Sequence, residues 1–202
     1  MPEQVLVTER EFRKSRALFE EAAAWQIRCV PAEEEQLAQA VLRHASRAVI
    51  VGVTPYRGPL YEALGRTGAG KGALLARYGV GHDNIDKALA RRHGIVVTNT
   101  PGVLETSVAE HVLWLLGCLA KQVPRLDQRL RAGDFSSEPG VEVCGKTLGI
   151  LGFGAIGRRL APMAHFGFGL RVIAADVLPP VALERQLGKP FDRIKAEAGL
   201  DE

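Results

Sequence analysis

The fold of this chain is restricted most by a regular alternation of short apolar runs with longer helical patterns. Strands of this length, each followed by a helical stretch, favour a parallel sheet with helices on both faces. We therefore predict an α/β fold. The runs that indicate strands are VLVT (5–8), WQIRCV (25–30), RAVIVGV (47–53), ALLARYGV (73–80), IVVTN (95–99), TLGILGF (147–153) and LRVIAADV (170–177).

A long helical pattern separates the first five of these runs from the last two. At its start, Ser107 and Glu110 have the spacing of a capping box. A break in the helix is expected near Pro124, because proline disrupts helical hydrogen bonding. The change of pattern predicts two domains, which cover residues 1–99 and 100–202.

Two glycine-rich stretches compete for the role of a phosphate-binding loop. Residues 65–72, GRTGAGKG, nearly match the loop of nucleoside-triphosphate-binding proteins. Such a loop must follow a strand and open a helix, because the free N–H groups of the helix N-terminus bind the phosphate. Here a helical pattern comes first and a strand follows, and Gly72 stands where Ser or Thr would hold magnesium. We interpret this stretch as a surface connection.

The second stretch, GFGAIG at 152–157, has the required context, since it leaves a predicted strand and opens a helical pattern. In a G-x-G-x-x-G loop the first glycine allows a tight turn. The second lets a pyrophosphate approach the backbone, and the third lets helix and strand pack closely. Asp176 ends the next predicted strand, where its carboxylate would bind ribose hydroxyls and repel a 2′-phosphate. These residues predict a dinucleotide site that prefers NAD to NADP.

The overall composition argues against several other functions. The net charge is only +3 and no long run of Lys or Arg is present, so nucleic-acid binding is not expected. No apolar run reaches the ~18 residues that a membrane span needs, and no signal peptide is recognised, so a cytoplasmic protein is expected. Cys29, Cys118 and Cys144 fit no metal-binding or redox spacing and are expected to be reduced thiols.

Three segments of the chain resemble the D-isomer-specific 2-hydroxyacid dehydrogenase family. They are LLARYGVGHDNIDKALARRHGIVVTNTPG (74–102), similar to its substrate loop, SVAEHVLWLLGCLAK (107–121), similar to its dimer-forming helix, and GKTLGILGFGAIG (145–157), similar to its cofactor loop. The resemblance implies a flavodoxin-like substrate domain followed by a Rossmann domain, with the active site between them. It also implies hydride transfer between NAD and the second carbon of a small 2-hydroxy or 2-keto acid, in a homodimer formed through the helix at 107–123.

The resemblance also implies roles for individual residues. Gly79, Val80 and Gly81 would present backbone N–H groups to the substrate carboxylate, with Val80 near the nicotinamide. Tyr56 and Arg57 follow another predicted strand and are candidate substrate contacts, although Arg57 fits a solvated surface residue equally well. The cofactor would be bound by Gly152, Phe153, Gly154, Ala155, Ile156, Gly157 and Asp176.

No catalytic residue and no metal site are assigned in this sequence. The pair His82–Asp83 is a poor candidate, because adjacent residues rarely orient each other for proton transfer. In the family, the catalytic arginine, glutamate and histidine follow the second Rossmann strand, and the polar, partly helical residues after Asp176 contain no match for them. We therefore expect a chain that is truncated within its cofactor domain and inactive alone. A non-catalytic module for NAD sensing or protein association is the alternative. Phosphoglycerate, glycerate, glyoxylate and lactate are all open as substrates.

Overall fold

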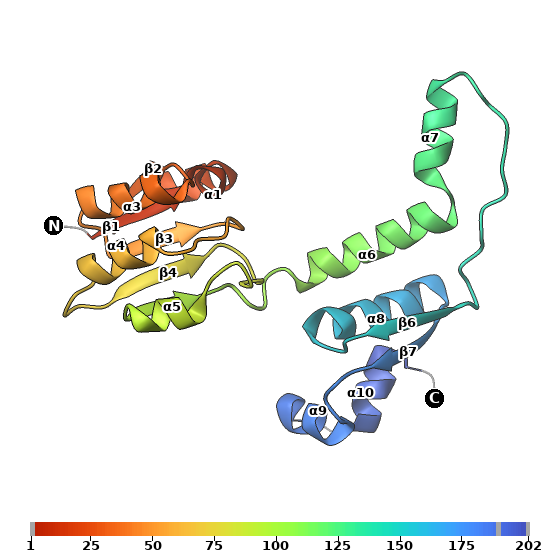
Figure 1. Cartoon of the computed structure of the whole chain (residues 1–202). Helices are drawn as coiled ribbons and strands as arrows, with labels where there is room; N and C mark the ends of the chain where they lie inside the picture. The colour runs from red at the N-terminus through yellow and green to blue at the C-terminus, as the bar shows by residue number, and fades with distance from the viewer. Residues whose placement is uncertain (1–2, 189–190, 201–202) are drawn as a thin grey trace. The chain divides into compact units, whose positions relative to one another are not determined.

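The computed structural model describes residues 3–188 and 191–200, and the chain forms two compact units, Met1–Val103 and Leu104–Glu202 (Figure 1). The strands of the first unit are β1 (Gln4–Thr8), β2 (Gln26–Val30), β3 (Ala48–Val51), β4 (Ala73–Arg77) and β5 (Ile95–Thr98). All neighbouring strands pair in parallel, in the order β2-β1-β3-β4-β5. This is the order of flavodoxin-like sheets, which confirms the predicted fold class.

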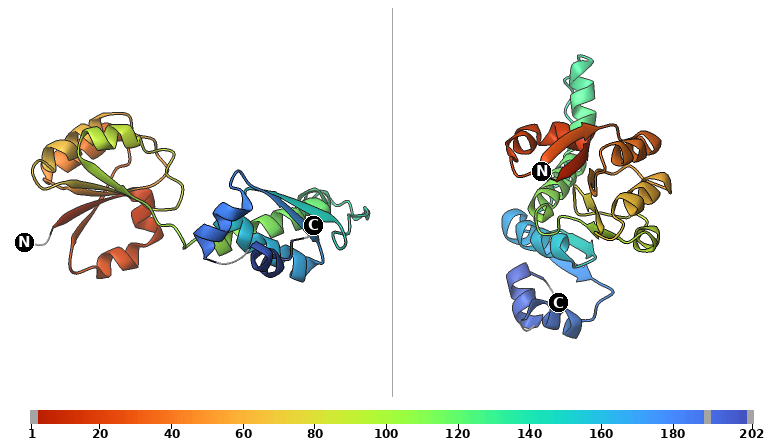
Figure 2. Two further views of the ribbon diagram at one scale, coloured as in Figure 1. Left: turned by 90° about the horizontal axis from the view of Figure 1, so that it is seen from below. Right: turned by 90° about the vertical axis from the view of Figure 1, so that its left-hand side faces the viewer.

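Helices cover both faces of this sheet, as a parallel arrangement requires. They are α1 (Glu9–Lys14), α2 (Arg16–Glu21), α3 (Glu34–Arg43), α4 (Pro59–Thr67) and α5 (Lys87–Arg92). Figure 2 shows α3, α4 and α5 on one face of the sheet and α1 and α2 on the other. The core contains fully buried aliphatic side chains, among them Leu6, Leu37, Val49, Leu64 and Leu75. Burial of each such side chain stabilises the fold by roughly 1.5–3 kcal/mol.

Glu34, in the first turn of α3, caps the N-terminus of α4. Its carboxylate accepts hydrogen bonds from the N–H groups of Arg57 (2.9 Å), Gly58 (2.9 Å) and Leu60 (3.3 Å). The first N–H groups of a helix have no partner within the helix, and they favour a negative charge. Glu34 therefore fixes the loop after β3 and occupies a position where an external anion would otherwise bind.

The second unit contains the strand–helix–strand element that the sequence predicts. Its elements are α6 (Glu105–Ala120), α7 (Val123–Arg131), β6 (Thr147–Leu151), α8 (Ala155–Phe168), β7 (Arg171–Ala175), α9 (Pro180–Leu187) and α10 (Phe191–Ala198). β6 and β7 pair in parallel, with α8 between them in the chain. Ala109 and Leu113 of α6 join Leu160 and Ala164 of α8 in one buried cluster.

The long helix begins earlier than the capping-box prediction allows. α6 starts at Glu105, with Leu104 at the N-cap and no side-chain cap. A capping serine must lie just outside the helix, whereas Ser107 lies in the first turn, so the predicted cap formed by Ser107 and Glu110 is wrong. The predicted break is confirmed, because α6 ends before Pro124 and Pro124 lies in the first turn of α7.

The strand β6 is more exposed than its apolar sequence predicts. Ile150 is buried, but Leu151 is 91% exposed, and Ile173 of β7 is 44% exposed. Successive side chains of a strand point to opposite faces of the sheet. Within the described residues, Ile150 and Val172 are buried on one face of this two-stranded sheet, while the other face exposes apolar side chains.

Replacing Glu34 with alanine is expected to lower the free energy of unfolding by about 1–2 kcal/mol, because three N–H groups lose their acceptor. Glu62→Ala, at an exposed position of α4 itself, is the control and should change stability by less than about 0.5 kcal/mol. Urea denaturation followed by circular dichroism measures both variants. Equal midpoints for the two would contradict the capping role of Glu34.

Candidate functional site

The glycine-rich stretch at 65–72 lies at the amino end of a strand. It leaves α4 and enters β4, so the predicted order of helix, turn and strand is confirmed. Gly70 and Gly72 have φ angles of +70° and +75°, and Arg47 donates a hydrogen bond to the carbonyl oxygen of Lys71 (3.0 Å). No helix begins at this turn, so it lacks the free N–H groups of a helix N-terminus that bind a phosphate. The turn is therefore not suited to a phosphate.

The stretch at 152–157 instead joins the carboxyl end of β6 to the N-terminus of α8, and each glycine meets a different requirement. Gly152 has a φ angle of +96°, in the region that favours glycine. Gly154 is the N-cap residue and has open space where a Cβ would lie. At Gly157 a Cβ would lie 2.5 Å from the carbonyl oxygen of Gly152 and 3.2 Å from Cγ2 of Ile150. Only glycine at this position lets α8 pack so close to β6.

The N-terminus of α8 presents unpaired N–H groups next to this loop. The first hydrogen bond of the helix runs from the N–H of Arg158 to the carbonyl of Gly154 (3.0 Å), so the N–H groups of Ala155 and Ile156 have no partner within the helix. Both residues are exposed, whereas the side chain of Phe153 is buried. The site can therefore accept an anion such as a pyrophosphate through backbone groups.

Asp176 directly follows β7 and lies against the same loop. Its Oδ2 accepts a hydrogen bond from the N–H of Phe153 (2.5 Å), and its Oδ1 accepts one from the N–H of Leu178 (2.9 Å). The bond from Leu178, followed by that from Phe153, lowers the pKa of Asp176 below its ordinary value, so the group is a carboxylate at neutral pH. Each carboxylate oxygen keeps capacity for a further hydrogen bond from a hydroxyl group.

The loop after β4 contains the predicted substrate residues. Gly79 has a φ angle of +144°, and a Cβ there would lie 2.5 Å from Nη1 of Arg77. The N–H of Gly79 donates to the carbonyl of Arg77 (2.9 Å), so this group is not free for a ligand, contrary to the prediction. The N–H groups of Val80 and Gly81 have no hydrogen-bond partner within residues 3–188 and 191–200. These two groups can bind a carboxylate.

Two asparagines that the sequence did not single out hold this loop in place. Nδ2 of Asn99 donates to the carbonyl of Val80 (2.8 Å). Nδ2 of Asn84 donates to the carbonyls of Gly52 and Thr54 (3.1 Å each), which ties the loop after β4 to the loop after β3. The sequence shows only an asparagine close to a strand end, which is common in turns of every kind. It therefore could not identify these two residues.

Tyr56 and Arg57 lie in the loop after β3 but have different surroundings. Tyr56 is only 2% exposed and belongs to the core, and burial raises the pKa of its phenol to about 12. Direct contact of this side chain with a substrate is therefore not supported, and its packing anchors the loop. Arg57 is exposed while its N–H is held by Glu34, so its guanidinium group is the better candidate for contact with an anion.

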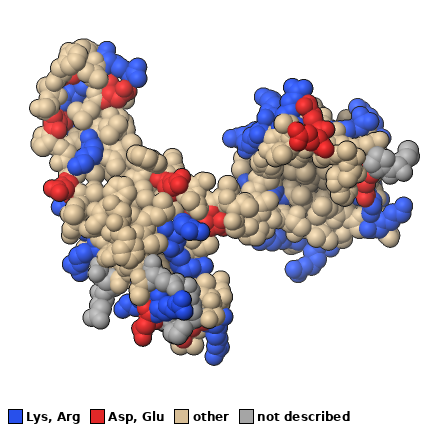
Figure 3. Space-filling view, turned by 180° about the vertical axis from the view of Figure 1, so that it is seen from behind, with Lys and Arg blue, Asp and Glu red and all other residues tan. Residues whose placement is uncertain are grey.

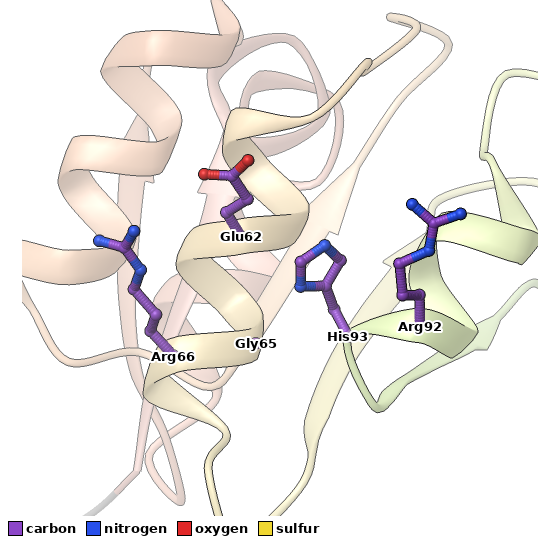
Figure 4. Close-up of a pocket in the computed structure, with 5 residues that line it drawn as sticks. All are labelled: Glu62, Gly65, Arg66, Arg92 and His93. Atoms are coloured by element: carbon purple, nitrogen blue, oxygen red, sulfur yellow. The ribbon is translucent and has the colours of Figure 1, made fainter.

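A cavity of about 510 Å³ lies between α4 and the residues that lead into β5, at the edge of the sheet opposite the loop after β4. Figure 4 shows the guanidinium groups of Arg66 and Arg92 on opposite sides of the pocket, with His93 between them and directed towards the helix that carries Gly65. Cations that stand apart in this way do not form one anion site. The cavity is therefore not assigned as the site.

The described part of the chain offers neither a metal-binding cluster nor a membrane-spanning helix. Within it, no group of three or more His, Cys, Asp or Glu side chains is placed to hold a metal ion. None of the described helices combines the length and the hydropathy of a membrane span. The three cysteines are free thiols, as predicted. Figure 3 shows basic and acidic side chains interspersed over the face that it draws.

Comparison with known proteins agrees with the geometry of these loops. Residues 5–187 match the family described as D-isomer specific 2-hydroxyacid dehydrogenase, catalytic domain. The glyoxylate reductase of Pyrococcus furiosus is 36% identical over 137 residues, which are 62% of this chain and 40% of that protein. The hydroxypyruvate reductase of Thermotoga maritima is 42% identical over 109 residues, which are 53% of this chain and 35% of that protein.

The fold is also shared with a solved dehydrogenase. The apo-structure of D-lactate dehydrogenase from Escherichia coli superposes with a TM-score of 0.71 at 26% identity, over 93% of this chain and 59% of that one. The chain thus spans about 40% of the length of the first of these curated relatives and somewhat more than half of the solved structure.

Gly157→Ala is expected to destabilise the second unit by about 1–3 kcal/mol, because the new methyl group would overlap the carbonyl of Gly152. Gly167→Ala, in the same helix but with nothing within 4 Å of the added Cβ, is the control. It should raise stability by up to about 1 kcal/mol through helix propensity. Thermal unfolding of both variants is the measurement, and an unchanged or higher midpoint for Gly157→Ala would show that the loop tolerates a side chain.

Proposed function

Because the chain belongs to the D-isomer specific 2-hydroxyacid dehydrogenase family, we propose that it forms part of an NAD-dependent oxidoreductase that interconverts a 2-hydroxy acid and a 2-keto acid. The observation that carries the proposal is the loop Gly152–Gly157, which opens α8 and has the Asp176 carboxylate beside it. This combination suits the pyrophosphate and the adenosine ribose of a dinucleotide. NAD, when bound, supplies or accepts the hydride.

The proposed cofactor contacts follow from the groups that the loop leaves available. The N–H groups of Ala155 and Ile156 would bind the pyrophosphate. Asp176 would accept hydrogen bonds from the ribose hydroxyls, and its negative charge would disfavour the 2′-phosphate of NADP. Val80 would lie near the nicotinamide.

The proposed substrate is a small 2-keto or 2-hydroxy acid. The unpaired N–H groups of Val80 and Gly81 would bind its carboxylate, and Arg57 would bind a second anionic group where the substrate has one. Relatives named glyoxylate reductase and hydroxypyruvate reductase make two- and three-carbon keto acids the first compounds to test. A cytoplasmic location is part of the proposal, since the substrates and the cofactor are small and water-soluble.

The proton step of the reaction is not assigned to any residue of this chain. Reduction of a keto group needs an acid within hydrogen-bond reach of its oxygen, and none of the candidate loops carries a histidine or carboxylate with that role. We therefore propose that these residues bind and orient NAD and the substrate carboxylate. Turnover would also require a proton donor, a role that the proposal gives to none of these loop residues.

We also propose that the chain forms a homodimer through the helix predicted at 107–123. The exposed side of α6 carries Trp114 (75% exposed), Leu115 (50%) and Leu119 (78%). None of these three side chains belongs to the buried cluster that contains Ala109 and Leu113. Contiguous exposed apolar side chains of this size are typical of protein–protein interfaces.

Asp176→Ala is expected to weaken NAD binding by roughly tenfold or more and to reduce the preference for NAD over NADP, because charged hydrogen bonds to the ribose are lost. Lys71→Ala, in the turn at 65–72, should leave NAD binding unchanged and is the control. Calorimetric titration of each variant with NAD and NADP measures both effects. Unaltered affinity and unaltered preference in Asp176→Ala would refute the assignment of this residue.

Leu119→Glu is expected to shift the chain from dimer to monomer, because a carboxylate would be buried in the proposed interface. Leu18→Glu, at an exposed leucine of α2 (69% exposed), is the matched control and should not change the mass. Analytical ultracentrifugation of the parent and both variants provides the test. A parent chain that is monomeric would contradict the proposed homodimer.

A further inference from the structure

The backbone of Phe153 is held on both of its peptide groups by charged side chains. Its N–H donates to Oδ2 of Asp176 (2.5 Å), and its carbonyl oxygen accepts a hydrogen bond from Nη1 of Arg158 (2.8 Å). Asp176 follows β7, whereas Arg158 lies in the first turn of α8. Two elements that flank the cofactor loop thus fix one residue of it.

Both charged groups are themselves held in position. The second oxygen of Asp176 accepts a hydrogen bond from the N–H of Leu178 (2.9 Å), which prevents the carboxylate from turning away. The backbone N–H of Arg158 donates to the carbonyl of Gly154, and the residue is half-buried. The charge of Arg158 also helps to keep Asp176 ionised.

Two other contacts hold this part of the backbone, namely the buried side chain of Phe153 and the hydrogen bond from the N–H of Gly152 to the carbonyl of Ala175 (2.7 Å). Phe153 stands between Gly152, at a φ angle of +96°, and Gly154, and glycine has the widest conformational freedom of any residue. Gly154 at the N-cap and Ala155 after it have no polar side chains, and α8 has no side-chain cap. Asp176 and Arg158 therefore add the polar contacts that fix the N–H and the carbonyl of Phe153.

We propose that Arg158 is a positioning residue. Together with Asp176 it holds the N–H and the carbonyl of Phe153, so that the loop is preorganised for NAD before the cofactor binds. Asp176 then has two roles, because it orders the loop and also accepts hydrogen bonds from the ribose hydroxyls. Preorganisation raises affinity because less conformational freedom is lost on binding. The inference rests on the proposed cofactor role of the loop, but the ordering of Phe153 is a property of the chain without NAD.

The test compares Arg158→Met with Arg159→Met. Methionine keeps an unbranched apolar side chain but has no donor, and Arg159 is the exposed neighbour on the same helix. In the absence of NAD, amide hydrogen exchange at Phe153 should be about tenfold faster in Arg158→Met than in the parent and unchanged in Arg159→Met. NAD affinity should fall by about tenfold in Arg158→Met alone. The two variants should have similar thermal midpoints, and Arg158→Lys should recover part of the affinity.

The outcomes separate this inference from the proposed function. Equal exchange at Phe153 in the two methionine variants would overturn the role of Arg158, whatever the affinity for NAD. Fast exchange in Arg158→Met, combined with a parent chain that does not bind NAD at all, would support the ordering of the loop and overturn the proposed function instead. If Arg158→Met does not fold, Arg158→Ala is compared with Arg159→Ala, and equal exchange at Phe153 with equal NAD affinity in these two variants would overturn the inference.

Discussion

The parallel pairing of the strands decides where this chain can bind a ligand. In a parallel sheet all strands end at the same edge, and the loops that leave that edge are free to surround a ligand. The predicted substrate loop follows β4, the glycine loop follows β6, and Asp176 follows β7, so all three lie at carboxyl ends. The stretch at 65–72 lies at the amino end of β4, and no helix begins after it. Its glycines are therefore not placed beside free N–H groups of a helix N-terminus.

In the proposed function, both candidate loops bind their ligands through the backbone, and side chains serve mainly to hold the backbone in place. Positive φ angles at Gly79 and Gly152 turn the chain so that later N–H groups become available. Asn84 and Asn99 hold the first loop, and Asp176 holds the second together with Arg158. Loops of this kind offer N–H groups to anions, and the carboxylate and pyrophosphate of the proposed ligands are anions.

Much of this arrangement could be predicted from the sequence, because it depends on local pattern. The strands lie where the apolar runs predict them, and the glycine spacing at 152–157 identifies the turn between β6 and α8. Two of the missed features depend on contacts between distant residues. Glu34 caps a helix that starts 25 residues later, and Tyr56 packs into the core. The hydrogen bond from the N–H of Gly79 to the carbonyl of Arg77 is local, but it depends on a backbone angle that the sequence does not specify. The start of α6 was missed because the capping spacing of Ser107 and Glu110 also occurs inside helices.

The central claim is that the loop at 152–157, and not the stretch at 65–72, binds NAD. Titration of the ¹⁵N-labelled chain with NAD, followed by two-dimensional NMR, tests it residue by residue. The account predicts that amide signals of Gly152–Gly157 and Asp176 move with increasing NAD, while those of Gly68–Gly72 stay in place. Movement of the signals at Gly68–Gly72, or no movement at Gly152–Gly157 at saturating NAD, would contradict it.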